Sequence, residues 1–261
     1  MEVLIRETAD TGCALGAKII ARVVREKPDA VLGLATGRTP LRLYQELIRL
    51  HREEGLDFSR VTTFNLDEYV GLPATHDQSY RYFMRENLFR HINIDQSRTH
   101  VPDGTAADLH AEGRGYEQKI LEAGGIDIQL LGLGRNGHIG FNEPTGSLRS
   151  RTWIKILSEQ TLRDNSAVFG SFESMPKHAL TMGIGTILDA RRCLLLAFGP
   201  AKVRAVAQMV EGPLAAICPG SALQLHPRAT VILDETSAAG LSYADHYRWI
   251  DSHKLAWQRN G

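Results

Sequence analysis

The chain has 261 residues, of which 43% are hydrophobic and 23% charged, and 30 Lys and Arg residues balance 30 Asp and Glu residues. This composition is typical of globular proteins and excludes a disulfide-stapled miniprotein, a disordered chain and a broadly basic nucleic-acid-binding surface. No stretch reaches the roughly 18 apolar residues of a membrane span, and the first residues lack a signal-peptide pattern. We therefore expect no nucleic-acid or membrane partner and a cytoplasmic location.

The three cysteines are widely spaced, without a CxxC pair, and are expected to be small core residues. Elsewhere, apolar runs of strand length alternate with amphipathic helical segments, which predicts one α/β domain with a parallel sheet and crossover helices. A helix is predicted to begin at Pro40 with Thr39 as its N-cap. The other predicted helical segments are about 79–92, from 199 onward and near 221–225, and the predicted strands are 30–35, 61–66, 126–131, 193–198 and 230–234.

Polar and glycine-containing segments follow these predicted strands. They cover residues 36–39, 67–69, 136–143 and 199–202. Because ligands of an open parallel sheet bind outside the carboxyl ends of its strands, we expect the four segments to converge on one crevice.

The segment at residues 36–39 has the features of an anion site. Thr36, Gly37, Arg38 and Thr39 supply backbone N–H groups, two hydroxyls and a guanidinium at a helix N-terminus, which favours a phosphate group. An ordinary capped turn is the alternative interpretation. The segment is neither a Walker loop nor a GxGxxG fingerprint, so nucleotide binding is not indicated. Lys202, at the start of the helix after another strand, is positioned to add a second positive charge.

Two further segments carry proton-transfer groups. Asp67 and Glu68 follow a strand on adjacent positions, so we expect only one of them to enter the crevice as a base, and the spacing alone does not choose between them. His138 and Glu143 share one short loop, and a carboxylate beside an imidazole fixes its tautomer and raises its basicity. A zinc site would need further ligands at suitable spacing, so no metal is expected.

Three motifs closely resemble those of the glucosamine-6-phosphate deaminase family: LATGRTP at 34–40, FNLDEYVGL at 64–72 and NGHIGFNEP at 136–144. Shorter matches at 150–152, 179–183 and 221–226 extend the likeness over most of the chain. The resemblance implies a single α/β domain with a modified doubly wound, Rossmann-like sheet. It also implies conversion of glucosamine 6-phosphate and water to fructose 6-phosphate and ammonium, without metal or organic cofactor.

The resemblance also implies roles for individual residues. Asp67, rather than Glu68, is the base that moves a proton from C2 to C1 of the opened sugar. His138 opens the pyranose ring, Glu143 orients this histidine, and Asn136 completes the relay. The phosphate grip consists of Thr36, Gly37, Arg38, Thr39 and Lys202.

Departures from the family pattern lead to further expectations. Asn136 stands where the hexameric, allosteric members have Asp, so the pKa of His138 should be lower than in those members. In a mobile lid at about 158–178, Ala167 replaces a common phosphate-binding arginine, for which Arg38 or Arg163 is expected to substitute. The stretch 146–156 lacks several polar and basic residues of the allosteric site, so activation by N-acetylglucosamine 6-phosphate should be weak or absent.

Two other functions compete with the deaminase interpretation. A 6-phosphogluconolactonase shares the general fold and grips a sugar phosphate but lacks the NGHIGFNEP arrangement. A sugar-phosphate sensor without turnover would not need Asp67, His138 and Glu143 together. The aromatic-rich segment from Ser237 onward is compatible with packing on the main body or on another copy, so a homo-oligomer stays open.

Overall fold

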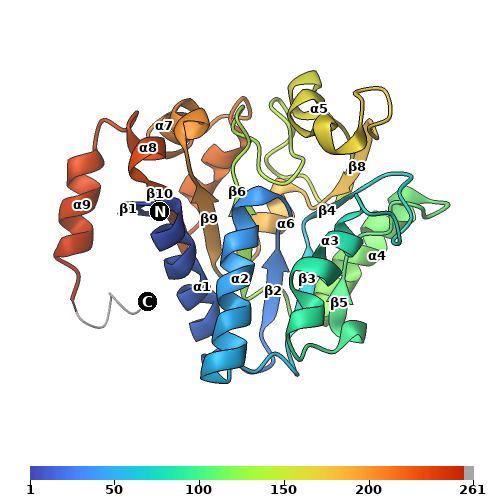
Figure 1. The fold of residues 1–261 in the computed structure, drawn as a ribbon. Helices are drawn as coiled ribbons and strands as arrows, with labels where there is room; N and C mark the ends of the chain where they lie inside the picture. Colours follow the sequence, from blue (N-terminus) through green and yellow to red (C-terminus); the bar gives the residue numbers. More distant parts are fainter. Residues whose placement is uncertain (256–261) are drawn as a thin grey trace.

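A computed structural model describes residues 1–255, except for the side chains of residues 167 and 168. The main sheet has seven strands in the order β1-β10-β9-β6-β2-β3-β5, and all neighbouring pairs are parallel (Figure 1). This single-domain α/β architecture, with a mostly parallel sheet flanked by helices, confirms the predicted fold class. The strands are β1 (Glu2–Arg6), β2 (Val31–Leu34), β3 (Thr62–Asn65), β5 (Thr99–His100), β6 (Ile128–Gly132), β9 (Cys193–Ala197) and β10 (Ala229–Asp234).

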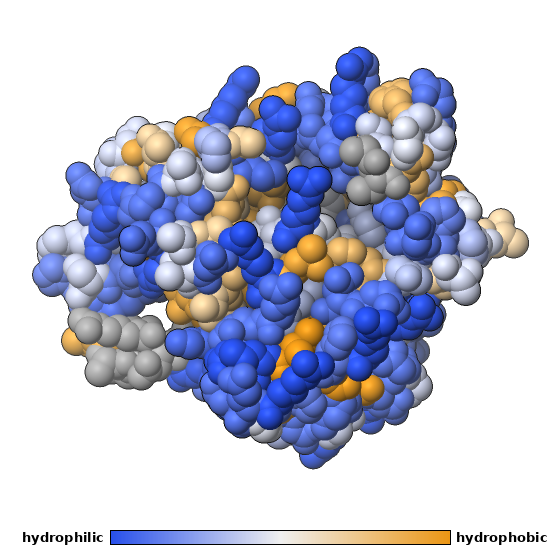
Figure 2. Space-filling view, viewed as in Figure 1, coloured by the Kyte–Doolittle hydropathy of each residue, from blue (hydrophilic) through white to orange (hydrophobic). Residues whose placement is uncertain are grey.

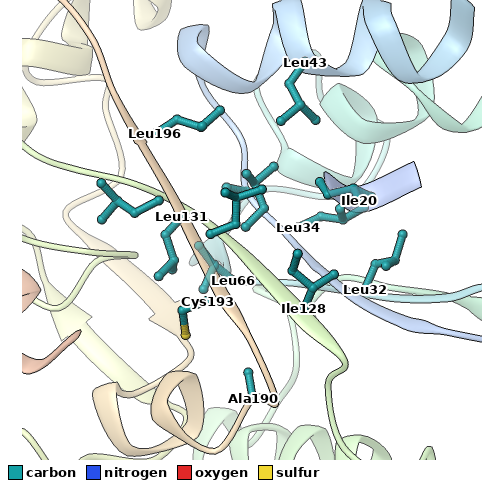
Figure 3. Close-up of a cluster of buried hydrophobic side chains, with 14 of the residues drawn as sticks. Ile20, Leu32, Leu34, Leu43, Leu66, Ile128, Leu131, Ala190, Cys193 and Leu196 are labelled. Carbon is teal, nitrogen blue, oxygen red and sulfur yellow. The ribbon is translucent and has the colours of Figure 1, made fainter. Parts of the chain in front are cut away.

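Helices flank the sheet, with α1 and α2 in front of it in the view of Figure 1 and α6 behind it. The helices are α1 (Ala9–Glu26), α2 (Arg38–Glu54), α3 (Tyr80–Asn87), α4 (Leu109–Glu122), α5 (Glu159–Asn165), α6 (Ile184–Leu188), α7 (Val203–Val210), α8 (Glu235–Ala238) and α9 (Ala244–Ser252). In the core, Ile20 and Leu43 from α1 and α2 point towards strand residues such as Leu34 and Leu196, and all four are buried (Figure 3). The near-continuous apolar character of β2, β6 and β9 follows from this burial on both faces.

A second, smaller sheet was not predicted. It consists of β4 (Asp67–Tyr69), β8 (His178–Thr181) and β7 (Trp153–Ile156), with antiparallel pairing throughout. We expected Asp67–Tyr69 to end the strand at 61–66. Instead, Leu66 is the point of transfer: its N–H bonds the Leu34 carbonyl of the main sheet, and its carbonyl accepts from Met182 N–H, which follows β8.

Helix α2 begins at Arg38, two residues before the predicted start, and its N-cap is Gly37 rather than Thr39. Gly37 has φ 107°, a conformation that side chains disfavour, and this turn brings the chain directly from the strand into the helix. Thr39 is thus in the first turn, and no side chain caps the helix. The free N–H groups of this turn remain available to a ligand.

The other predicted elements lie within a few residues of the observed ones. The helix expected at 79–92 ends as α3 at Asn87 and continues as a 3₁₀ turn over Phe89–His91. The helix expected from 199 begins as a 3₁₀ turn, Pro200–Lys202, before α7, and the segment near 221–225 is 3₁₀ over Pro219–Leu225. Cys13, Cys193 and Cys218 are free and buried, as predicted.

The C-terminal helix α9 packs beside β1 at one edge of the main sheet (Figure 1). Arg6 Nη1 lies 2.8 Å from Asp251 Oδ2 of this helix, and Lys254 Nζ, two residues after its end, lies 2.7 Å from Glu2 Oε1. The segment from Ser237 thus contacts the main body through α9, while its aromatic side chains Tyr243 and Trp249 are exposed. No helix within residues 1–255 combines the length and apolar character needed to cross a membrane.

Candidate active site

A cleft of 560 Å³ opens where β2, β6 and β9 end and the small sheet begins. On the face in Figure 2 the surface is mostly hydrophilic and is hollowed near the top, between α7 and α5. All four polar segments expected to converge contribute to the lining of this cleft. The site residues that line it are Thr36, Gly37, Arg38, Thr39, Asp67, His138 and Lys202.

The N-terminal end of α2 forms one wall of the cleft. Residues 36–39 line it, and the first-turn N–H groups of this 17-residue helix lack a side-chain cap. The helix dipole and these N–H groups favour an anion, and the Arg38 guanidinium adds a full positive charge. The wall is therefore suited to a phosphate group.

Lys202 lies at the same cleft on the 3₁₀ turn that precedes α7. Its Nζ donates a hydrogen bond to the Leu133 carbonyl at 2.6 Å, which holds the ammonium beside the loop after β6. Burial lowers the pKa of Lys202, Asp164 opposes this effect, and Arg135 adds to it. A bound anion would remove part of that burial penalty by pairing with the ammonium.

Asp67 and Glu68 point to different environments. Asp67 lines the cleft, whereas Glu68 is buried beneath it and accepts hydrogen bonds from the backbone N–H groups of Tyr80 and Arg81, at the start of α3. The expectation that only one of the two enters the crevice is confirmed. Glu68 instead satisfies free N–H groups at a helix N-terminus.

The Asp67 carboxylate is buried, and no donor among the described side chains and backbone groups hydrogen-bonds to it. Burial, and secondarily the neighbouring Glu68 charge, raises the pKa of Asp67 to about 8. A carboxylate with this pKa is a stronger base than an ordinary aspartate and titrates near neutral pH. The group is therefore suited to take a proton from a carbon acid and return it.

His138 also faces the cleft, and two side chains hold it from behind. Its Nδ1 lies 2.6 Å from Asn136 Oδ1, and Asn136 Nδ2 donates to Glu143 Oε2 at 2.8 Å. His138 Nδ1 is 3.7 Å from the same Glu143 oxygen. Because Asn136 Oδ1 can only accept, Nδ1 carries the proton and Nε2 is left as the basic atom.

The electrostatics of this relay favour a neutral imidazole beside an ionised carboxylate. Burial lowers the pKa of His138, although the Glu143 charge acts in the opposite direction. Burial opposes ionisation of Glu143, but its pKa is nevertheless lowered, because His138, Thr161 and Asn136 stabilise the anion. Asn136 and Glu143 do not line the cleft; they position His138.

Gly134 makes room for the imidazole. A Cβ at this position would lie 2.3 Å from the His138 ring, far inside contact distance. The Gly134 N–H also donates to the His138 carbonyl at 2.8 Å, which closes the loop on itself. The requirement for glycine therefore comes from packing against the histidine.

Several cleft residues were not found from the sequence. The aromatic side chains of Tyr69, Tyr80, Phe141 and Phe169 form a wall beside Asp67, with ring centroids of Tyr69 and Tyr80 4.9 Å apart. Thr161 of α5 donates from Oγ1 to Glu143 Oε1, as does the Ser158 N–H. Their roles depend on the approach of a distant segment, for which the sequence offers no local signal.

Two arginines were expected to replace the missing lid arginine, and one of them lies at the cleft. Arg38 lines the cleft, whereas Arg163 does not and is paired with Glu159 on the same helix. The side chain of Ala167, which replaces the phosphate-binding arginine common in the family, lies outside the described residues. Within the described part of the chain, no group of three His, Cys, Asp or Glu side chains is placed to hold a metal ion.

Residues 5–232 match the family described as glucosamine-6-phosphate isomerases/6-phosphogluconolactonase. The chain belongs to this family. Members called glucosamine-6-phosphate deaminase from Hahella chejuensis and Arthrobacter sp. are each 53% identical over 258 residues, which cover 99% of this chain and 98% and 99% of theirs.

Solved structures of the same family agree with the fold. One described as a monomeric glucosamine-6-phosphate deaminase superimposes with a TM-score of 0.91 at 49% identity, covering 92% of this chain and all of that chain. A 6-phosphogluconolactonase from Trypanosoma cruzi gives a TM-score of 0.73 at 21% identity, over 92% of this chain and 97% of the other. At that identity the second match supports the shared fold alone.

Proposed function

We propose that this chain converts glucosamine 6-phosphate and water to fructose 6-phosphate and ammonium. The proposal rests on one cleft in which Asp67 and His138, the latter held by Asn136 and Glu143, face a cationic helix N-terminus. Relatives that are 53% identical over nearly their whole length carry the name of this activity.

The phosphate anchors the substrate in this proposal. The wall formed by residues 36–39 and the Lys202 ammonium offers N–H donors, hydroxyls and positive charge. The phosphate is remote from the reacting carbons, so its binding energy serves to hold C1 and C2 in place.

His138 opens the sugar ring. Ring opening removes a proton from O1 and delivers one to O5, and a neutral imidazole with a free Nε2 can do both in turn. Asn136 fixes the tautomer, and Glu143 stabilises the imidazolium while it holds the proton. These two are positioning residues.

Asp67 carries out the isomerisation. As a carboxylate it takes the proton from C2 of the open aldose while O1 gains a proton from the substrate's ammonium group, which forms an enol-type intermediate. The protonated Asp67 then returns its proton to C1. C2 is then an imine carbon, to which water adds, and ammonium leaves with formation of the ketose. The steps consist of proton transfers, addition of water and departure of ammonium, with no net oxidation or reduction. We propose that they proceed in the cytoplasm without metal or organic cofactor.

We further propose that residues 158–178, which include α5, form a lid over the substrate. Contacts of this segment support the proposal. Ser158 and Thr161 donate hydrogen bonds to Glu143, and the cleft is lined by Asp164, Asn165 and Phe169. A lid in this position excludes water from the proton-transfer steps and completes the relay at the same time.

The test is release of ammonium and fructose 6-phosphate from glucosamine 6-phosphate, with wild type beside Asp67→Asn and with a metal chelator present. Chelator-resistant turnover that the substitution abolishes supports both the activity and the role of Asp67. Absence of turnover despite binding of the sugar phosphate overturns the proposal in favour of a sensor. Hydrolysis of 6-phosphogluconolactone instead would assign a lactonase.

A further inference from the structure

Arg135 lies at the mouth of the cleft, outside the phosphate grip described above. Its Nη1 is 3.2 Å from Oδ1 of Asp164, in the last turn of α5, and both side chains line the cleft. Arg135 directly precedes Asn136 of the relay. The ion pair therefore connects the loop of the catalytic histidine to the proposed lid.

Arg135 and Lys202 belong to one cationic cluster. Lys202 Nζ bonds the carbonyl of Leu133, two residues before Arg135 in the same loop. Arg135 also acts electrostatically on Lys202. Burial has the largest effect and lowers the pKa of Lys202, Asp164 raises this pKa, and Arg135 lowers it further. An anion that reaches the Lys202 ammonium therefore enters the field of the Arg135 guanidinium.

The partner of Arg135 in this structure is weakly held. The side chains of Arg135 and Asp164 are 55% and 31% exposed, and Asp164 Oδ1 also accepts from Gln160 Nε2 at 2.8 Å. Exposed pairs of this kind contribute little, whereas a guanidinium binds phosphate through two parallel, charge-assisted hydrogen bonds. A phosphate dianion in the cleft thus competes favourably with Asp164 for Arg135.

We propose that Arg135 is a ligand of the substrate's phosphate group and that Asp164 is its counter-ion when the cleft is empty. The inference rests on the proposed function for the identity of the substrate. When the substrate binds, the guanidinium exchanges the Asp164 carboxylate for the phosphate. The exchange releases the bond between α5 and the loop after β6, so phosphate binding and the position of the lid are linked.

The experiment compares Arg135→Gln, Arg135→Lys and Asp164→Asn with wild type. Arg25→Gln is the matched control, because Arg25 is also a half-exposed arginine paired with a carboxylate, Glu54, but lies outside the cleft lining and the proposed lid. The first readout is the Kd of inorganic phosphate by calorimetry, which requires no turnover. The second is KM and kcat for glucosamine 6-phosphate.

We expect Arg135→Gln to raise both the phosphate Kd and KM by about tenfold, with kcat changed less than about twofold. Arg135→Lys should recover part of the loss, since it keeps the charge but not the bidentate geometry. Asp164→Asn should lower the phosphate Kd about two- to fivefold, because the competing carboxylate is gone. Arg25→Gln should match wild type.

An unchanged phosphate Kd in Arg135→Gln overturns the inference. So does equal weakening by Arg135→Gln and Asp164→Asn, which would make the pair a structural brace. If phosphate binding depends on Arg135 as expected but wild type releases no ammonium, the inference on Arg135 as a phosphate ligand stands and the proposed function fails. The two failures are therefore distinguishable.

Discussion

Thr161 Oγ1 donates a hydrogen bond to Oε1 of Glu143, and this bond joins α5 to the residue that orients His138. Glu143 Oε2 is bound by Asn136, so the two carboxylate oxygens are held by different segments of the chain. The geometry of the relay thus depends on the presence of α5 at the cleft.

The first prediction concerns this contact. Thr161→Val removes the donor at nearly constant volume, which raises the pKa of Glu143 and loosens the relay, so kcat should fall about tenfold with little change in KM. Thr186→Val is the control, because Thr186 is a buried threonine whose hydroxyl donates to a carboxylate, Glu117, away from the cleft. Equal kinetic effects of the two substitutions would contradict the prediction.

The second prediction separates stability from catalysis at Asp67. The pKa of Asp67 is about 8 in the folded chain and roughly 4 when unfolded, so the folded state binds more protons between these values and loses stability as the pH rises. Asp67→Asn removes this penalty. We expect turnover to be abolished while the free energy of unfolding at pH 8 increases by roughly 2–4 kcal/mol.

Urea unfolding of both proteins at pH 5 and pH 8 measures this effect. The gain should be larger at pH 8 than at pH 5, because Asp67 of the folded wild type is protonated at the lower pH. A gain that does not depend on pH would show that the carboxyl is not the source.

The third prediction concerns Asn136. In Asn136→Asp, a carboxylate beside Nδ1–H favours the imidazolium and raises the pKa of His138, while the bond from Nδ2 to Glu143 is lost. The acid limb of the kcat/KM profile should therefore lie about one pH unit lower in wild type than in the variant. Superimposable pH profiles would show that His138 does not set this limb.

The fourth prediction concerns the anion wall. Arg38→Gly removes the guanidinium from the first turn of α2, so KM for glucosamine 6-phosphate should rise severalfold and kcat should change little. Initial-rate measurements at two salt concentrations check it, because the difference should shrink as ionic strength screens the charge. An unchanged KM at low salt would place Arg38 outside the phosphate contact.

The fifth prediction concerns allosteric control. In the stretch 146–156, Arg151 is already paired with Glu117 and Asp189, and Lys155 Nζ lies over the Trp153 ring. These two cations remain, but Gly146, Trp153 and Ile156 in this stretch supply no hydroxyl or positive charge for a second sugar phosphate. Rates should depend hyperbolically on substrate and should not respond to N-acetylglucosamine 6-phosphate; sigmoidal kinetics that this compound renders hyperbolic would contradict the prediction.

The sequence was sufficient to predict the parts of the fold whose signals are local. The runs at β2, β6, β9 and β10 are strongly apolar, so their positions followed within about two residues. The small sheet was missed because β4, Asp67–Tyr69, is only three residues long and pairs with β8, more than a hundred residues away. The start of α2 was misplaced because Gly37 adopts a positive φ that makes Thr39 unnecessary as a cap.

The candidate site, like the fold, was predictable from the sequence only where its signals are local. Its segments were predicted from their positions after strands and by resemblance. The alternation of side chains along the strand predicted that only one of Asp67 and Glu68 enters the cleft, and the resemblance favoured Asp67. Thr161, Asp164, Tyr80 and Phe169 could not be predicted, since they reach the cleft only through tertiary packing of α3, α5 and the turn after α5.

The transfer of the chain at Leu66 from the main sheet to the small one has a further consequence. Asp67 belongs to the small sheet, whereas Thr36 and Lys202 follow strands of the main sheet. In the proposed reaction, the placement of the small sheet relative to the main sheet therefore sets the separation between the base at C2 and the phosphate-binding residues. We therefore expect a pentose 5-phosphate, which has one carbon fewer between C2 and the phosphate, to be a poor substrate.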